Sequence, residues 1–137
     1  MKRRVAVDTG PLVALFDPSD HDHPQALAFF ANPTVRGFVT TAVITEVTHL
    51  LDFRRDLPVN FLRWLKRGAF EVEDVAGDLE RIVVLMAKYA DVPMDFADAT
   101  IVAASERLGI RDVATLDSGF TIFRLNGRQA FQNHFPC

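Results

Sequence analysis

Apolar residues follow two patterns along this chain, and the two patterns alternate from one end to the other. Short runs rich in valine, isoleucine or phenylalanine predict buried strands, because β-branched and aromatic side chains pack well on a pleated sheet. Longer segments with apolar residues three or four positions apart predict helices with one buried face. The predicted strands are residues 3–7, 37–40, 70–75 and 112–116, with a fifth candidate at 121–125. The predicted helices are residues 11–16, 24–30, from 40 or 41 to about 52, 58–67, 78–89 and 95–108.

The residues at the segment boundaries support this alternation. Pro11, Pro24 and Pro58 begin predicted helices, where the missing backbone N–H of proline has no partner to lose. Gly68 and Gly109 follow predicted helices, as expected of residues that end a helix. Strands separated by helices imply an α/β sandwich with a mostly parallel sheet. The length of 137 residues fits a single domain over residues 1–137, with no internal repeat, low-complexity tract or linker.

Acidic residues lie where a parallel sheet gathers its ligands, which is beyond the carboxyl ends of the strands. Asp8 follows the first predicted strand, and Asp117 follows the fourth. Glu46 falls on or beside the apolar stripe of the helix after the second strand. Asp98 lies in the first turn of the last predicted helix, where the helix dipole favours a carboxylate. Asp95, three residues earlier, is close to it on the helix surface.

A cluster of carboxylates at one edge would suit a hard divalent cation. Mg²⁺ prefers oxygen ligands and keeps several waters, so one or two carboxylates bind it directly and others act through water. Such an ion polarises a phosphate, lowers the pKa of a bound water and stabilises a leaving oxygen. The site then needs no serine, cysteine or histidine nucleophile, and the sequence shows no Ser-His-Asp or Cys-His arrangement. His49 has no visible partner in the sequence.

Each of these acids also has an ordinary structural alternative. Asp8 and Asp95 could cap the helices that follow them, since aspartate is a favoured N-cap residue. Asp98 could stabilise a helix dipole, and Glu46 could be a solvated helix residue. Asp117 precedes Ser-Gly and could belong to a plain turn. The case for a metal site therefore depends on all four acids meeting at one edge of one sheet.

Charge and cysteine content decide little about the partner. The formal net charge is −3, from 18 acidic and 15 basic residues. Setting aside four of the 18 acidic residues for the metal site leaves 14 against 15 basic ones. The one cysteine, Cys137, excludes a disulfide within the chain and a cysteine zinc site. The basic N-terminus is followed by an apolar run that stops at Asp8, too short for a signal peptide or membrane span, so we expect a cytoplasmic protein without membrane association.

Four motifs in order resemble the PIN-domain family, and within it the VapC-like toxins and their close bacterial relatives. The first is Val-Ala-Val-Asp-Thr at residues 5–9, and the second is Thr-Thr-Ala-Val-Ile-Thr-Glu-Val at 40–47. The third is Asp-Ala-Thr-Ile-Val-Ala-Ala at 98–104, and the fourth is Ala-Thr-Leu-Asp-Ser-Gly-Phe at 114–120. Each motif is weak alone, whereas four in this order and spacing are specific. The resemblance covers residues 5 to about 123.

The resemblance implies a three-layer α/β/α fold and an endoribonuclease that depends on Mg²⁺ or Mn²⁺. It also implies an RNA substrate, a homodimer and, for a VapC-like toxin, a small inhibitory antitoxin protein. It places four acids in the metal site: Asp8, Glu46, Asp98 and Asp117. It gives Thr115 a supporting role, with Thr9 as a weaker candidate and Asp95 as a secondary acid.

Other interpretations stay open beside this one. The basic run Arg63, Trp64, Lys66 and Arg67 could bind RNA phosphates and stack a base on tryptophan, but a solvated helix face with Trp64 in the core is favoured. A non-catalytic PIN-like module that binds RNA or protein is the main functional alternative. The Asp-Thr-Gly at residue 8 also occurs in aspartic proteases, which are mostly β and do not fit the alternation. An aspartyl phosphatase would need a second acid at position 10, which is glycine.

Overall fold

A parallel sheet forms the centre of the computed structural model, which describes residues 2–135. The sheet has five strands in the order β3-β2-β1-β4-β7, and every neighbouring pair is parallel. A separate antiparallel pair, β5-β6, lies beside it. Their bounds are β1 Arg3–Val7, β2 Val35–Thr40, β3 Glu71–Glu73, β4 Asp112–Ala114, β5 Arg124–Leu125, β6 Gln129–Ala130 and β7 Gln132–Asn133. Cys137 lies outside the described residues.

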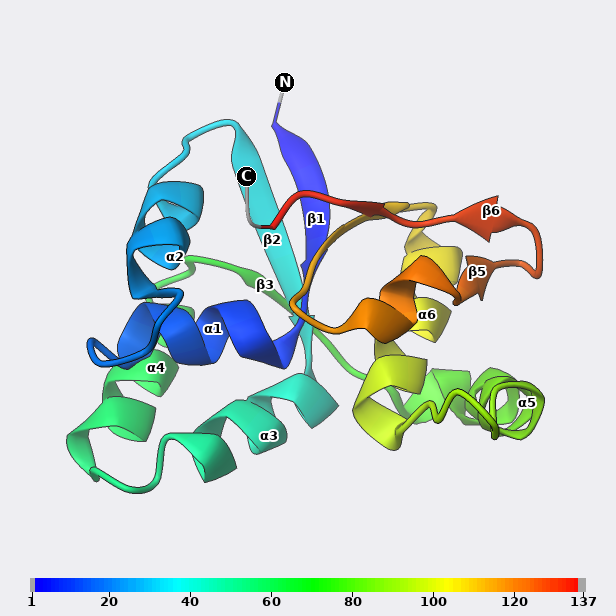
Figure 1. The fold of residues 1–137 in the computed structure, drawn as a ribbon, viewed down its shortest axis with the longest axis horizontal. Helices are drawn as coiled ribbons and strands as arrows, with labels where there is room; N and C mark the ends of the chain where they lie inside the picture. Colours follow the sequence, from blue (N-terminus) through cyan, green and yellow to red (C-terminus); the bar gives the residue numbers. More distant parts are fainter. Residues whose placement is uncertain (1, 136–137) are drawn as a thin grey trace.

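Helices cover both faces of this sheet, which confirms the three-layer α/β/α sandwich. In Figure 1, α1, α2 and α4 lie on one side of the strands, and α5 and α6 lie on the other. Helix α3 crosses the carboxyl-terminal edge and contacts α1, α4 and α6. The bounds are α1 Thr9–Phe16, α2 His23–Phe30, α3 Thr41–Leu50, α4 Asp56–Lys66, α5 Leu79–Lys88 and α6 Phe96–Leu108, with short 3-10 turns at η1 Ala76–Asp78 and η2 Ser118–Thr121. Among the described residues, no helix combines the length and apolar composition that crossing a bilayer requires.

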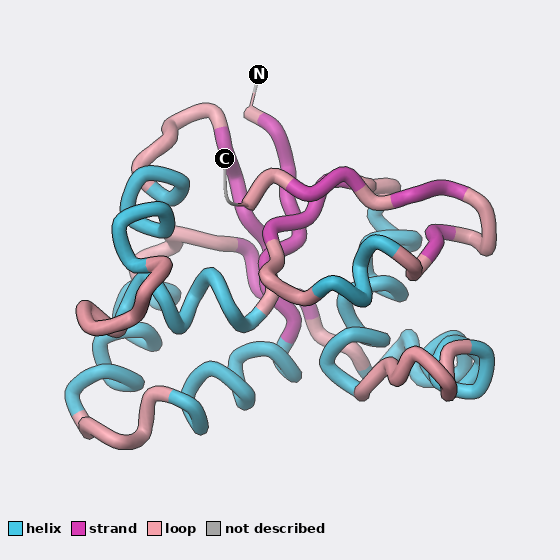
Figure 2. The backbone as a smooth tube through the Cα atoms, in the orientation of Figure 1, coloured by secondary structure: helices cyan, strands magenta, loops and turns pink. Residues whose placement is uncertain are grey.

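The prediction of a strand at residues 121–125 is wrong for its first three residues, and β5, its remainder, lies outside the main sheet. Thr121 belongs to η2, where its hydroxyl donates to the backbone oxygen of Ser118. Phe123 is buried for a different reason, since it packs its ring edge-on against Tyr89 and Phe120. The fifth strand of the main sheet is β7, a short polar segment near the C-terminus that pairs with β4. Figure 2 shows most of the strands at the centre, with helices on both sides.

A chain of buried hydroxyl groups joins the first turns of α3 and α6. The Val43 backbone N–H donates to Thr40 Oγ1 at 3.3 Å, and Thr40 Oγ1 lies 2.8 Å from Thr100 Oγ1. Thr100 Oγ1 itself donates to the backbone oxygen of Ala97 at 2.7 Å, so Thr40 must be the donor between the two threonines. Both threonines are fully buried, where an unpaired polar group is costly. The chain therefore ties together the starts of the two helices that carry Glu46 and Asp98.

We expect Thr100→Val to lower the free energy of unfolding by about 1–3 kcal/mol, because it leaves the buried Thr40 hydroxyl without an acceptor. Urea denaturation measures this change. Thr45→Val is the matched control, because the Thr45 hydroxyl is exposed and bonds only to its own helix. The control should change stability by no more than about 0.5 kcal/mol. Equal effects of the two variants would contradict a structural role for the hydroxyl chain.

Candidate metal centre

Three aspartates that are far apart in the sequence converge at the carboxyl-terminal edge of the sheet. Asp8 follows β1, Asp98 lies in the first turn of α6, and Asp117 lies just beyond β4. Each offers one carboxylate oxygen, and these three oxygens all lie within 4.8 Å of one another. Asp8 and Asp98 are buried, whereas Asp117 is exposed. The cluster therefore lies where the core meets solvent, open to a ligand from one side.

A threonine between them links Asp8 and Asp117. The Thr115 hydroxyl donates to Asp8 Oδ2 at 2.7 Å and accepts from the backbone N–H of Asp117 at 2.9 Å. The other oxygen of Asp8 accepts from the backbone N–H of Thr9 at 2.7 Å, and Asp117 Oδ1 accepts from that of Gly119 at 2.8 Å. One oxygen of Asp117 thus stays without a partner among the described residues. The supporting role that the resemblance implies for Thr115 stays a prediction, and these two hydrogen bonds are consistent with it.

Asp95 and Asp98 form a reciprocal capping box at the start of α6. Asp95 Oδ1 accepts from the Asp98 backbone N–H at 2.8 Å, and Asp98 Oδ2 accepts from that of Asp95 at 3.2 Å. Asp95 is therefore an N-cap residue, which is the structural alternative that the sequence offered for it. Asp98 keeps its second oxygen free for the cluster. The capping bond to Oδ2 orients the Asp98 side chain and leaves its other carboxylate oxygen unbonded among the described residues.

Glu46 lies in the same cleft but outside the three-aspartate cluster. The cleft has a volume of about 280 Å³. It is lined by Asp8, Thr9, Gly10, Glu46, Leu50, Asp95, Asp98, Leu116 and Asp117. The charge of Glu46 is felt at Asp8, where it contributes to the raised pKa of that carboxyl. All four acids therefore meet in one cleft, with three in close contact and Glu46 set back on α3.

The sequence model of the PIN domain family matches residues 5–124, which takes in all four acids. The chain belongs to the PIN-domain family. It is 30% identical to Ribonuclease VapC26 of Mycobacterium tuberculosis over 81% of this chain and 84% of that protein. The order of four motifs along the sequence predicted this membership correctly.

Solved structures share the fold of this PIN domain. A crystal structure of Mycobacterium tuberculosis VapC20, described as a toxin that cleaves the sarcin-ricin loop, superposes with a TM-score of 0.76 at 25% identity, over 83% of this chain and 90% of that one. A toxin-antitoxin complex from Klebsiella pneumoniae gives a TM-score of 0.61 at 21% identity, over 83% of this chain and 87% of that one. The second likeness concerns the fold alone.

Burial and mutual repulsion raise the pKa of two carboxyls in the PIN domain. Burial raises the pKa of Asp8 to about 6, against the opposing bonds from Thr115 and Thr9 and with the charges of Asp117 and Glu46 adding to it. Burial also raises the pKa of Asp98 to about 8, and the neighbouring charges of Asp95, Asp8 and Asp117 add to it. Both raised pKa values mean that the negatively charged form of each carboxyl is unfavourable in the folded protein. A cation bound beside them would relieve this cost.

The donor set of the cleft fits a hard divalent cation. Its polar side chains are carboxylates and one hydroxyl, and no lysine or arginine is among the residues that line it. Thr9 also lines the cleft, and its buried Oγ1 has no hydrogen-bond partner within the described residues. Oxygen ligands of this kind suit Mg²⁺ or Mn²⁺ rather than a metal that prefers nitrogen or sulfur.

The basic residues predicted as RNA contacts lie away from this cleft. Arg63, Lys66 and Arg67 are exposed on and just after α4, and none of them lines the cleft. Trp64 packs among aromatic rings, with centroids 4.7 Å from Phe70 and 5.4 Å from Phe16. Trp64 is half-buried and packs against the hydrophobic core, as the favoured interpretation predicted.

One residue that supports the site was missed in the sequence. Asn133 on β7 accepts from the Thr115 backbone N–H at 3.1 Å and donates to the Thr115 backbone oxygen at 3.1 Å. It thereby fixes the backbone of the threonine that links Asp8 and Asp117. An asparagine in a polar C-terminal segment carries no local signal of this role, because the contact spans 18 residues.

We expect the metal-free protein to lose stability as pH rises from 5 to 8. The folded state binds protons at Asp8 and Asp98 more tightly than the unfolded state, where the ordinary pKa is 3.8. The stability present below about pH 4 is therefore lost as pH passes through about 6 for Asp8 and about 8 for Asp98. Each pKa unit corresponds to about 1.4 kcal/mol, so the loss should be on the order of a few kcal/mol. Melting curves in EDTA measure it.

Asp98→Asn should remove most of this pH dependence between pH 6 and 8, because asparagine keeps an oxygen for the capping bond but carries no proton equilibrium. Glu80→Gln, which neutralises an exposed acid on α5, should retain the full dependence. If stability changes with pH in the same way in wild type and in Asp98→Asn, the titration of Asp98 is not the source of the pH dependence.

Proposed function

We propose that this PIN domain is a divalent-metal-dependent endoribonuclease that hydrolyses RNA phosphodiester bonds. The observation that carries the proposal is the convergence of three carboxylate oxygens within 4.8 Å of one another. A module that only bound RNA would gain nothing from clustered negative charge beside the phosphates. The names of the relatives, a ribonuclease and a toxin that cleaves the sarcin-ricin loop, support the same activity.

In this proposal Asp8, Asp98 and Asp117 bind the ion through the oxygens that meet in the cleft. When bound, a divalent cation polarises the phosphate and lowers the pKa of a water molecule. Glu46, set back on α3, accepts the proton of the attacking water. The water oxygen forms a bond to phosphorus while the bond to the leaving oxygen breaks, and the leaving oxygen takes up a proton from solvent water, while Glu46 returns its proton to solvent. Thr115 holds Asp8 and Asp117 next to each other through its two hydrogen bonds.

The oxygen-rich cleft supports Mg²⁺ or Mn²⁺ as the working ion, and we propose these two in preference to zinc. Because the VapC20 toxin cleaves the sarcin-ricin loop, we propose a structured RNA loop as the substrate class, and an RNA that contains this loop belongs in any first assay. The exposed basic face of α4, formed by Arg63, Lys66 and Arg67, stays a predicted contact for RNA phosphates away from the cleft.

We propose a small antitoxin protein and a second copy of the chain as protein partners. Leu50, Phe53 and Leu62 expose apolar side chains on α3, after it and on α4, a surface that an inhibitor could cover. The Klebsiella pneumoniae relative in fold is described as a toxin-antitoxin complex, which supports this partner. Leu79 and Val83 lie one turn apart on α5 with 51% and 68% of their surfaces exposed, and we propose this face for a homodimer.

We expect wild-type protein to cut RNA in Mn²⁺ or Mg²⁺ and not in EDTA. Asp8→Asn, Asp98→Asn and Asp117→Asn should each lower the cleavage rate on the order of 100-fold or more, because each removes a charged ligand. The measurement is a time course with RNA that contains the sarcin-ricin loop and with unstructured RNA, followed by primer extension to locate the cut.

The control is Glu80→Gln, which removes one acid from the exposed face of α5 and should cut as wild type does. The melting temperature of each variant without metal identifies any loss of fold. If no RNA is cut in any metal, and Asp8→Asn binds RNA as wild type does, the binding-module alternative replaces the ribonuclease.

A further inference from the structure

A second cavity lies directly beside the metal cleft, between the start of α3 and the start of α6. Its volume is about 440 Å³, within the range of about 300–1,000 Å³ typical of small-molecule sites. Glu46 and Asp95 line both this cavity and the metal cleft. The two spaces therefore share a wall, and we call the second one the side pocket. The sequence gives no sign of it, because it forms only when the two helices meet.

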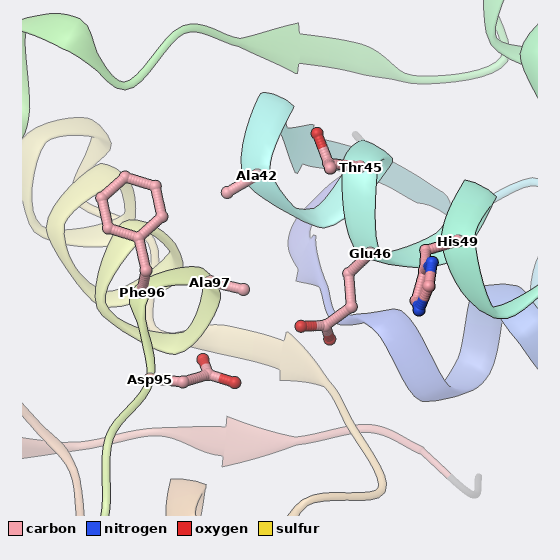
Figure 3. Close-up of a pocket in the computed structure, with 7 residues that line it drawn as sticks. All are labelled: Ala42, Thr45, Glu46, His49, Asp95, Phe96 and Ala97. Carbon is pink, nitrogen blue, oxygen red and sulfur yellow. The ribbon is translucent and has the colours of Figure 1, made fainter.

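The side pocket combines an apolar surface with polar groups at its edge. Figure 3 shows Phe96 at one end and His49 at the other, with the carboxylates of Glu46 and Asp95 directed into the space between. The small side chains of Ala42 and Ala97 also line the pocket, on the side of Phe96 that faces Glu46. Small alanine side chains leave room for a flat ligand beside the ring.

Phe96 is exposed where the fold does not require it. Its surface is 43% accessible, and the ring is not part of the hydrophobic core cluster formed by the described residues. Other aromatic rings of the protein, such as Trp64 and Phe70, pack against one another. An exposed aromatic ring beside a phosphate-cutting site is a platform on which a base can stack.

We propose that the side pocket binds one unpaired nucleobase of the RNA, next to the phosphate that is cut. This inference rests on the proposed ribonuclease function. The base stacks against Phe96, and one of its N–H groups donates to Asp95, whose Oδ2 has no partner within the described residues. His49, at the far end, contacts the adjoining sugar or phosphate. Phe96 would then determine which RNA is held in register, while the aspartates carry out the cut.

The shared wall argues for a nucleotide rather than a protein segment. When a phosphate lies in the metal cleft, the base of the same nucleotide lies close to the wall formed by Glu46 and Asp95, which the side pocket shares. A protein partner would need two separate side chains, an apolar one for the ring and an N–H donor for the two carboxylates at the pocket edge. A base supplies both a flat apolar face and N–H donors, so it satisfies the ring and the acids together.

The test uses single-stranded RNA octamers in which 2-aminopurine, a fluorescent base, is moved from position to position. Stacking on an aromatic ring quenches this base. The proteins carry Asp98→Asn so that RNA is bound without being cut, and they are compared with Phe96 intact, Phe96→Ala and Phe96→Tyr in EDTA at low salt. We expect quenching at one position with phenylalanine or tyrosine. Phe96→Ala should abolish it and weaken binding on the order of tenfold.

Phe53→Ala is the matched control, because Phe53 is also an exposed phenylalanine but does not line the side pocket. It should leave quenching unchanged. The inference is overturned if Phe96→Ala quenches and binds as its parent does, or if the parent quenches no base at any position. It is also overturned if Phe96→Ala changes only the sedimentation coefficient, since the ring would then belong to an interface between copies of the chain.

This readout stays separate from the ribonuclease proposal. Cleavage by otherwise wild-type protein in Mn²⁺ is measured in parallel, where Phe96→Ala should lower kcat/KM on the order of tenfold without changing the dependence on metal. If no RNA is cut but quenching remains, the ribonuclease proposal is wrong and the nucleobase site is supported. If metal-dependent cleavage is the same in Phe96→Ala as in wild type, the ribonuclease proposal is supported and the nucleobase site is contradicted.

Discussion

Three carboxylates held close together are the constraint around which this PIN domain is organised. Their oxygens lie within 4.8 Å of one another, two of the side chains are buried, and the pKa values of Asp8 and Asp98 rise to about 6 and about 8. Such a cluster persists only if other bonds oppose the repulsion. Backbone N–H groups supply part of them, since each aspartate has one oxygen bound to a nearby amide. The buried hydroxyl chain between Thr40 and Thr100 supplies another part by fixing the helices that carry Glu46 and Asp98.

The same arrangement resolves the competition between structural and functional interpretations of the acids. Asp8 caps α1, Asp117 caps the η2 turn, and Asp98 completes a capping box with Asp95. Capping uses one carboxylate oxygen, and on Asp98 and Asp117 it leaves the other without a partner among the described residues. The capping hydrogen bonds thus orient the carboxylates of the cluster. Local sequence could not separate the two roles, because the residues fulfil both.

Prediction from sequence succeeded where a feature depends on neighbouring residues. The strands that end at Asp8 and before Asp117 followed from their apolar runs, and the parallel-sheet rule then brought both acids to one edge. Glu46 and Asp98 needed the family resemblance, since their helices meet only through tertiary packing. Residues 121–123 misled because an aromatic cluster buries Phe123 as a strand would. Asn133 and the side pocket could not be predicted, because both depend on contacts between segments distant in sequence.

The most direct test of the central claim is to count the Mn²⁺ ions that the cluster binds. Free aqueous Mn²⁺ has a strong electron paramagnetic resonance signal that falls when the ion is bound. Titration at neutral pH should show saturable binding by wild type and by Glu80→Gln, and loss of that binding in Asp98→Asn, which removes one of the three converging carboxylates. Equal binding by wild type and Asp98→Asn, or no binding by wild type, would contradict a metal centre at Asp8, Asp98 and Asp117.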